Sequence, residues 1–169
     1  MSFGSGREWM LDRDESRELI DRAIELGVNF FDTANVYSGG ESESILGDVL
    51  ADYDRDEHVV ATKVRFPGAS DHRNARGLSR KTIEQELSNS LARLGMDTVD
   101  LYQIHRWDPD TPIGTTLRAL DDTVARGQVR HLGASSMWAH QFQRALQLSD
   151  REGLARFETM QNLYHLAYR

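Results

Sequence analysis

Helical and strand patterns of apolar and polar residues alternate along the whole chain. In five segments apolar residues recur every three or four positions, as in helices, and compact apolar runs between them are typical of buried strands. The expected helices cover residues 12–26, 43–52, 79–94, 113–126 and 139–148, and the expected strands cover 28–32, 58–64, 98–104, 129–134 and 157–161. This alternation predicts an α/β protein with a parallel sheet.

Capping residues mark several helix ends. Asp12, followed by Glu15 three positions later, is expected to cap the first helix, and Ser79 is expected to cap the third. Gly27 and Gly95 follow these two helices, at the position where glycine commonly ends a helix. The first helix is expected to turn one apolar stripe toward the core, namely Leu19, Ile20, Ala23 and Ile24.

Polar side chains follow the strands at the points where the strands end. The segment 28–32 reads as a buried strand that stops at Asp32, and the polar loop after it carries Tyr37. Lys63 lies at the end of the second strand, and His105 directly follows the third. Because parallel strands end at one edge of a sheet, these four side chains are expected to face the same opening.

Two parallel architectures fit this order of elements: a doubly wound open sheet and part of a closed (β/α)8 barrel. The glycine-rich fingerprint of dinucleotide-binding doubly wound folds is absent from the sequence, and so is the lysine-containing phosphate loop. Polar residues instead leave the carboxyl end of every strand, which is the end where barrel active sites are built. The pattern therefore favours part of a barrel.

Asp32, Tyr37, Lys63 and His105 are together suited to proton transfer. A nearby ammonium favours the phenolate form of a tyrosine, an aspartate supplies the counter-charge that a buried lysine needs, and a histidine can orient a carbonyl. These residue types fit reduction of a carbonyl group, with a nicotinamide as the source of hydride, because no side chain supplies hydride. Each also has a structural interpretation: a loop cap, a surface ring, a strand-end lysine and a hydrogen-bonded core histidine.

Composition narrows the classes of partner. A chain of 169 residues suffices for one domain with its own core. The net charge of −7 argues against nucleic-acid or anionic membrane surfaces, which would require clustered lysine and arginine. The absence of cysteine excludes disulfides and thiolate metal sites. We expect a cytoplasmic protein with small-molecule partners, no metal, no targeting segment and no membrane span.

Several motifs carry a resemblance to the aldo-keto reductase family. They lie at residues 30–37 with 40–43, 61–63, 99–105, 133–136 and 160–161, so the resemblance extends essentially from end to end. It implies a partial (β/α)8 TIM barrel, about strands 2 to 6 with their helices, in a single incomplete domain over residues 1–169. The sequences of residues 104–109 and 133–138 are most similar to those of prokaryotic reductases related to potassium-channel β subunits.

The resemblance also implies roles for individual residues. Tyr37 would be the general acid, Lys63 and Asp32 would favour release of its proton, and His105 would position the substrate carbonyl. The positions that match the family's contacts to the nicotinamide carboxamide are Ser135, Ser136 and Gln161, although many members have asparagine where Ser136 stands. NADP(H) is expected in preference to NAD(H).

Four residues near the strand ends have open alternatives. Trp107 and Trp138 lie just past strand ends and are candidate walls of an aromatic substrate pocket, or equally tryptophans that cap an edge of the core. Arg65 and Arg106 are candidates for contacts with substrate or cofactor phosphates, and solvated loop charges are their ordinary interpretation.

A closed (β/α)8 barrel takes roughly 250 residues, more than this chain contains. Residues 1–4 resemble only the tail of the family's first barrel strand, and the last two strands are expected to be missing together with much of the cofactor site. We therefore expect a chain truncated at both ends that by itself binds nicotinamide cofactor weakly or not at all. Open barrel edges are expected to favour self-association.

The sequence thus predicts reversible reduction of aldehydes or ketones to alcohols, dependent on a reduced nicotinamide. One alternative is a regulatory domain that senses cofactor with little turnover, and another is a chain that is inactive because it is incomplete. The substrate itself is not identified by the sequence.

Overall fold

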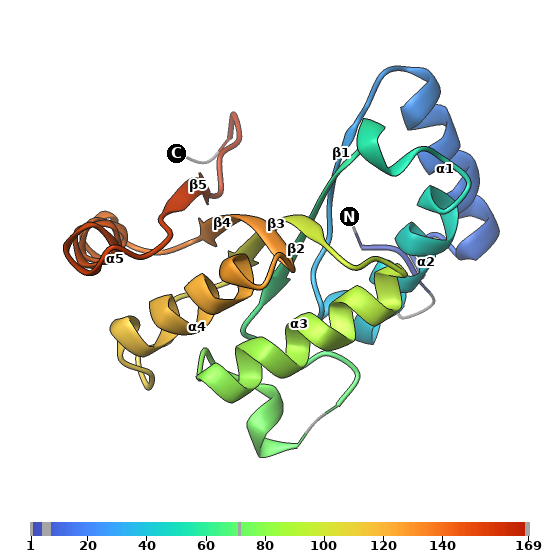
Figure 1. The fold of residues 1–169 in the computed structure, drawn as a ribbon. Coiled ribbons are helices and arrows are strands. Elements are labelled where there is room, and N and C mark those ends of the chain that lie inside the picture. Colours follow the sequence, from blue (N-terminus) through green and yellow to red (C-terminus); the bar gives the residue numbers. More distant parts are fainter. Residues whose placement is uncertain (1, 5–7, 71, 168–169) are drawn as a thin grey trace.

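The computed structural model describes residues 2–4, 8–70 and 72–167. Helices and strands alternate along the chain (Figure 1). The helices are α1 (Arg13–Glu25), α2 (Glu41–Leu50), α3 (Arg80–Leu94), α4 (Ile113–Ala125) and α5 (Ala139–Glu152). The strands are β1 (Phe30–Asp32), β2 (Val59–Val64), β3 (Val99–Ile104), β4 (Val129–Ser135) and β5 (Phe157–Gln161). Three 3-10 turns complete the described elements: η1 (Tyr37–Gly40), η2 (Arg55–Glu57) and η3 (Arg73–Ala75).

The five strands form one parallel sheet in the order β1-β2-β3-β4-β5. The sheet curls into a half-barrel, and the helices lie along its convex side, each packed against the next in sequence order (Figure 1). Strand order that follows chain order, with a helix between neighbours, is the topology of a (β/α)8 barrel. The prediction of a partial barrel is therefore confirmed, and the doubly wound alternative, in which strand order reverses, is excluded.

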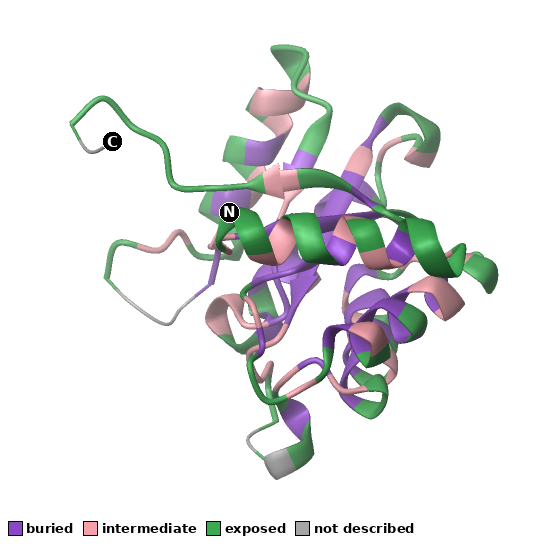
Figure 2. Cartoon of the chain, turned by 90° about the vertical axis from the view of Figure 1, so that its left-hand side faces the viewer, coloured by how far each residue is buried: buried purple, intermediate pink, exposed green. Residues whose placement is uncertain are grey.

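The hydrophobic core lies between the sheet and the helices. Outward-facing residues of the strands, such as Phe31 and Tyr102, are almost fully buried against the helical layer. Figure 2 shows the buried residues concentrated in this layer, whereas β5 and the segment after it are largely exposed. The opposite, concave face of the sheet is the place where alternate strand residues can meet a ligand.

The predicted helix caps are confirmed. Asp12 accepts a hydrogen bond from the backbone of Glu15, whose side chain accepts one from the backbone of Asp12, so the capping box is complete. The Ser79 hydroxyl accepts a hydrogen bond from the backbone of Thr82 at the start of α3. Gly95 adopts a left-handed conformation with φ of 65° at the end of that helix, a conformation that costs glycine little.

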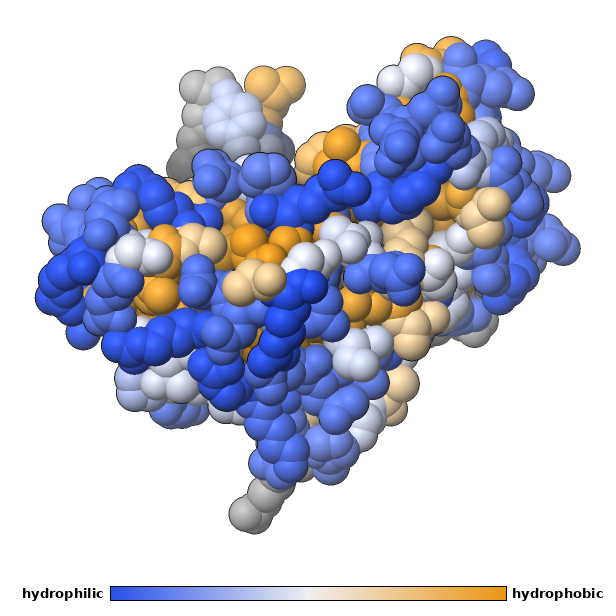
Figure 3. Space-filling model, viewed as in Figure 1, coloured by the Kyte–Doolittle hydropathy of each residue, from blue (hydrophilic) through white to orange (hydrophobic). Residues whose placement is uncertain are grey.

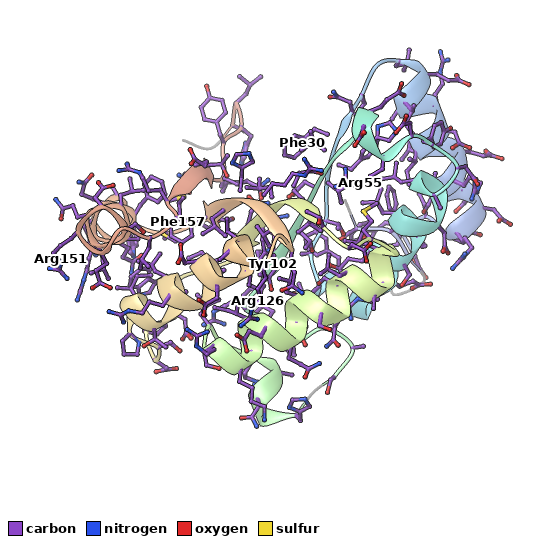
Figure 4. All side chains as sticks on the ribbon, in the orientation of Figure 1. Phe30, Arg55, Tyr102, Arg126, Arg151 and Phe157 are labelled. Atoms are coloured by element: carbon purple, nitrogen blue, oxygen red, sulfur yellow. The ribbon has the colours of Figure 1, made fainter. Side chains whose placement is uncertain are left out.

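Several side chains expected in the core are exposed instead. Leu19 is 51% exposed, because the stripe that α1 buries is centred on Ile20 and Ser16. Val28 and Phe30 are 44% and 50% exposed, and the first strand is shorter than expected. Within the described residues β1 pairs only with β2, so Phe30 at this edge of the sheet stays exposed. Figure 4 shows the Phe30 ring projecting from β1 toward the side on which β5 lies.

Smaller differences concern lengths. Helix α5 continues to Glu152, four residues beyond the expected end, and stops where Gly153 takes a left-handed conformation. The predicted long loop after β2 contains the turn η3. Residues 2–4 form no strand, and Met1 lies outside the described residues. Among the described residues, no helix has both the length and the apolar character needed to span a membrane.

Candidate active site

The carboxylate of Asp32, at the carboxyl end of β1, is the centre of a polar cluster on the concave face. Lys63 Nζ from β2 donates a hydrogen bond to Asp32 Oδ2 over 2.5 Å. Gln103 Nε2 from β3 donates to Oδ1 over 2.8 Å, and Gln161 Nε2 from β5 donates to Oδ2 over 3.2 Å. Four of the five strands thus contribute to one layer of hydrogen-bonded side chains inside the half-barrel.

Lys63 is a buried cation with a well-defined environment. Its side chain is 1% exposed, and its Nζ donates to the Thr33 carbonyl over 2.8 Å in addition to Asp32. A buried ammonium without a partner would lose its proton to escape the cost of desolvation. The Asp32 carboxylate offsets that cost, so the two side chains form an ion pair inside the half-barrel.

Tyr37 lies at the start of η1, in the loop that leaves β1. The turn is tight: Ser38 and Gly39 have φ values of 50° and 63°, in the left-handed region. This geometry leaves the half-buried Tyr37 ring over the mouth of the half-barrel, with Lys63 Nζ 5.2 Å from the ring centroid. The ammonium therefore lies over the face of the phenol ring, within the range of a cation–π contact.

His105 follows β3 and packs edge-to-face against two aromatic rings. Its ring centroid lies 5.7 Å from that of Tyr37 and 5.3 Å from that of Phe66. Burial, followed by the charges of Lys63 and Arg106, lowers the pKa of His105 from 6.5 to about 4, and the Asp32 charge opposes this shift. The imidazole is therefore neutral at neutral pH and can donate or accept a hydrogen bond without carrying charge.

The structure thus brings together all four residues that the sequence pattern had placed at one opening. Asp32, Lys63, Tyr37 and His105 form a continuous set of contacts at the carboxyl end of β1, β2 and β3. Another tyrosine, Tyr102 on β3, lies outside this set. Its hydroxyl lies 3.3 Å from the Ile83 carbonyl of α3, and burial raises its pKa.

Ser135, Ser136 and Gln161 form a second polar group beside this set. The two serine hydroxyls are 3.2 Å apart, and the Ser136 backbone donates to the Gln161 carbonyl over 3.0 Å. The φ of 48° at Ser136 turns the chain sharply where β4 ends. The three residues are adjacent, and Gln161 also connects them to Asp32 through its side-chain amide.

Trp107 and Trp138 line one open pocket at the carboxyl end of β3 and β4. Trp107 is partly buried against the core, whereas Trp138 is 72% exposed. Because both tryptophans line this pocket, both can contact a ligand in it, and Trp107 also covers an edge of the core. Figure 3 shows the face of the molecule on which α3 and α4 lie, where apolar atoms lie between hydrophilic ones.

The two candidate arginines lie in different loops, Arg65 in the loop after β2 and Arg106 in the loop after β3. Arg106 Nη1 donates to the His105 carbonyl over 2.8 Å and lies 3.5 Å from the Ser135 hydroxyl. The Arg65 guanidinium stacks over the Phe66 ring, 4.8 Å from its centroid. Arg106 adds positive charge beside the histidine and lies beside the serine group, whereas the charge of Arg65 acts on Asp108.

Two residues of the site were not singled out from the sequence. Gln103 lies two positions before His105 and therefore shares its face of β3, which is the signal that could have identified it. Asn35 donates from Nδ2 to the Phe66 carbonyl over 2.8 Å and to Glu86 Oε2 over 2.6 Å. It thereby connects the loop that carries Tyr37 to the loop that packs on His105. Its two contacts span 31 and 51 residues, so no local pattern signals them.

Comparison with known proteins gives a family match over the chain. The sequence profile of the Aldo/keto reductase family matches residues 1–169. An aldo-keto reductase of Alternaria alternata is 41% identical over 186 aligned positions, which cover 96% of this chain and 51% of that protein. The versiconal hemiacetal acetate reductase of Aspergillus parasiticus is 37% identical, over 100% of this chain and 55% of its own length. The chain therefore spans about half the length of the curated relatives it matches.

Proposed function

The chain belongs to the aldo/keto reductase family, and from this premise we propose that it carries the proton-transfer site for reversible reduction of aldehydes or ketones to alcohols. In the proposed reaction Tyr37 is the general acid. The observation that carries the proposal is the convergence of Asp32, Lys63, Tyr37 and His105 at one end of the sheet. These residues come from separate strands and loops, and their types match the chemistry that carbonyl reduction requires.

Reduced nicotinamide, when bound, supplies the hydride that reaches the carbonyl carbon. Tyr37 gives its proton to the carbonyl oxygen, so that one hydride and one proton convert the carbonyl to an alcohol. Lys63 stabilises the phenolate that remains, and Asp32 keeps the lysine charged in its buried position. Neutral His105 donates a hydrogen bond to the carbonyl oxygen and orients it toward Tyr37. Solvent then returns a proton to the half-buried phenol.

The residues at the ends of β4 and β5 suit the nicotinamide end of such a cofactor. A carboxamide needs both hydrogen-bond donors and acceptors, and the adjacent Ser135 and Ser136 hydroxyls with the exposed Gln161 amide offer both. We propose that these three side chains hold the carboxamide, and that NADP(H) is used in preference to NAD(H) on the ground of family resemblance.

For the substrate we propose a small carbonyl or alcohol compound with an aromatic or other flat apolar part. The support is the pocket beside His105, which is lined by Trp107, Trp138 and Met137. Aromatic rings stack favourably on indole side chains. We further propose that residues 1–169 belong to a single, incomplete barrel domain of a cytoplasmic protein, without nucleic-acid or membrane partners.

The test is the variant Tyr37→Phe, which removes the proposed acid and keeps the ring. We expect kcat for reduction of an aromatic aldehyde to fall by about 10²- to 10⁴-fold, because general acid catalysis contributes an effect of that order. Binding of reduced nicotinamide, followed by its fluorescence, should change little. The matched control is Tyr53→Phe, which removes a hydroxyl that bonds to Asp21 away from the site and should leave turnover intact.

Two results would contradict the proposal. Equal turnover by the original chain and Tyr37→Phe would exclude the phenol as the acid. Binding of the cofactor without turnover by either protein would favour a sensing role in place of catalysis.

A further inference from the structure

The amide of Gln103 occupies a position that the mechanism above leaves without a role. Its Nε2 donates to Asp32 Oδ1, whereas Lys63 donates to the other oxygen, Oδ2. The glutamine is 2% exposed and lies directly beside Lys63 in the register of β2 and β3. The two donors therefore hold the carboxylate from both oxygens.

The neighbouring strand leaves room for this side chain. Gly133 of β4 pairs with Gln103 of β3, and a Cβ added to Gly133 would lie 2.8 Å from Gln103 Cγ and 2.5 Å from Thr159 Oγ1. Such distances are shorter than ordinary van der Waals contact. Gly133 is not among the glycines with positive φ, so its backbone conformation does not require a glycine. What the missing side chain provides is space for the side chain of Gln103.

From these two observations we propose that Gln103 is a positioning residue of the proposed proton-transfer site. It fixes the rotation of the Asp32 carboxylate so that Oδ2 stays directed at Lys63, and so keeps the lysine ammonium beside the Tyr37 ring. This inference rests on the proposed function for its catalytic consequence, while the contact between Gln103 and Asp32 can be tested without turnover.

The physical reason lies in the freedom of a carboxylate. The terminal torsion of an aspartate has a broad energy profile, so hydrogen bonds determine which oxygen faces which donor. An amide donor to this partly buried carboxylate also compensates part of its negative charge, which otherwise opposes the positive field of Lys63 at the phenol. An apolar side chain at position 103 would fill the same space and supply neither effect.

The kinetic test compares Gln103→Leu with Gln103→Glu. We expect Gln103→Leu to lower kcat by about 10- to 100-fold, the effect of losing a hydrogen bond to a charged group, with little change in KM. At pH 8 Gln103→Glu should have a lower kcat than Gln103→Leu, because the introduced carboxylate is then ionised beside the carboxylate of Asp32. Relative to the original chain, its kcat should recover toward pH 5, because a protonated glutamic acid donates to Asp32 as the amide does. A residue that only fills space would show no such recovery.

A second measurement needs neither cofactor nor turnover. The charged groups that face His105 are Asp32 from β1, Lys63 from β2 and Arg106 beside it, and Tyr37 packs on its ring. In Gln103→Leu the Asp32 charge is less compensated, so the pKa of His105 measured by NMR should rise above about 4. The control Gln143→Leu changes an exposed glutamine of α5 and should leave both kcat and this titration unchanged.

The outcomes separate the two proposals. An unchanged His105 titration in Gln103→Leu, with the protein folded, overturns the positioning role whether or not the chain reduces carbonyls. A shifted titration in a chain that shows no turnover supports the contact and counts against the proposed function. If Gln103→Leu does not fold, Gln103→Asn, which is one methylene too short to reach Asp32, provides the same comparison.

Discussion

At the scale of single residues, Asp108 shows how a carboxylate ties two loops of the site together. It is 6% exposed and accepts hydrogen bonds from the Leu78 backbone over 2.8 Å and from the Thr111 hydroxyl over 2.7 Å. Burial by itself would raise the pKa of Asp108, but the bonds from Thr111, Leu78 and Asp110, with the charge of Arg65, outweigh it and hold the pKa below 3.8. Asp108 thereby fastens the loop after β2 to the loop after β3.

We predict that Asp108→Asn lowers the free energy of unfolding by about 1–3 kcal/mol at pH 7, because an amide nitrogen would replace an oxygen that accepts hydrogen bonds. A carboxylate whose pKa is depressed on folding contributes stability above its unfolded pKa and loses that contribution as pH falls through the folded value. The difference should therefore shrink below about pH 4. Urea unfolding at several pH values would measure it.

The control for this prediction is Asp110→Asn, which makes the same change of charge at an exposed neighbour. The Asp110 side chain should contribute little to the free energy of unfolding, since Asp110 donates to Asp108 Oδ1 from its backbone amide. Equal destabilisation by both variants, or a difference from the original chain that does not depend on pH, would show that the Asp108 hydrogen bonds are not the cause.

At the scale of elements, the approach of α2 to α3 depends on Gly47. A Cβ at this position would lie 2.4 Å from the Leu94 carbonyl oxygen and 2.6 Å from its carbon. Both are backbone atoms at the end of α3, so no side chain can move aside to relieve the overlap. Because α2 follows directly on the Tyr37 turn, its distance from α3 helps to set the position of that turn.

We predict that Gly47→Ala destabilises the fold by about 2 kcal/mol or more, because the overlap should exceed the gain of about 1 kcal/mol in helix propensity. Gly114→Ala is the matched control on α4: its new Cβ would meet the nearest atom, Leu148 Cδ2, at 3.4 Å, an ordinary contact. The control should stay within about 1 kcal/mol of the original chain. Thermal unfolding followed by circular dichroism distinguishes the two, and equal melting temperatures would contradict the prediction.

At the scale of the whole molecule, the sheet has two open edges. In the described part of the chain β1 pairs only with β2, and β5 pairs only with β4. Exposed apolar side chains lie near both edges: Val28 and Phe30 at β1, and Leu163, Tyr164 and Leu166 after β5. Unpaired strands with apolar neighbours are prone to pair with another copy of the same chain.

We predict that the chain self-associates, so that its mass in sedimentation experiments rises with protein concentration. Phe30→Lys should weaken the association, because it replaces an exposed apolar ring at the β1 edge with a charge. Leu26→Lys is the control, since Leu26 is 68% exposed at the end of α1 and outside the sheet. A single monomeric species at every concentration would refute the prediction.

The local sequence by itself determined the elements and the positions of the chemistry along them. Asp12 with Glu15, and Ser79 with Thr82, cap helices because both partners lie within one turn. Apolar spacing specified the order of strands and helices, and parallel strands must end at one edge. These rules placed Asp32, Lys63 and His105 together before any distance was known.

Only the tertiary structure decided which partners those residues have and which face is covered. Gln103 reaches Asp32 across 71 residues of sequence and Gln161 reaches it across 129, contacts that depend on the register and the curl of the whole sheet. Likewise, apolar character alone cannot say that Phe30 lies open and Phe31 is buried, since both satisfy a strand pattern. Short-range spacing fixes local geometry, whereas partners and burial depend on how distant segments meet.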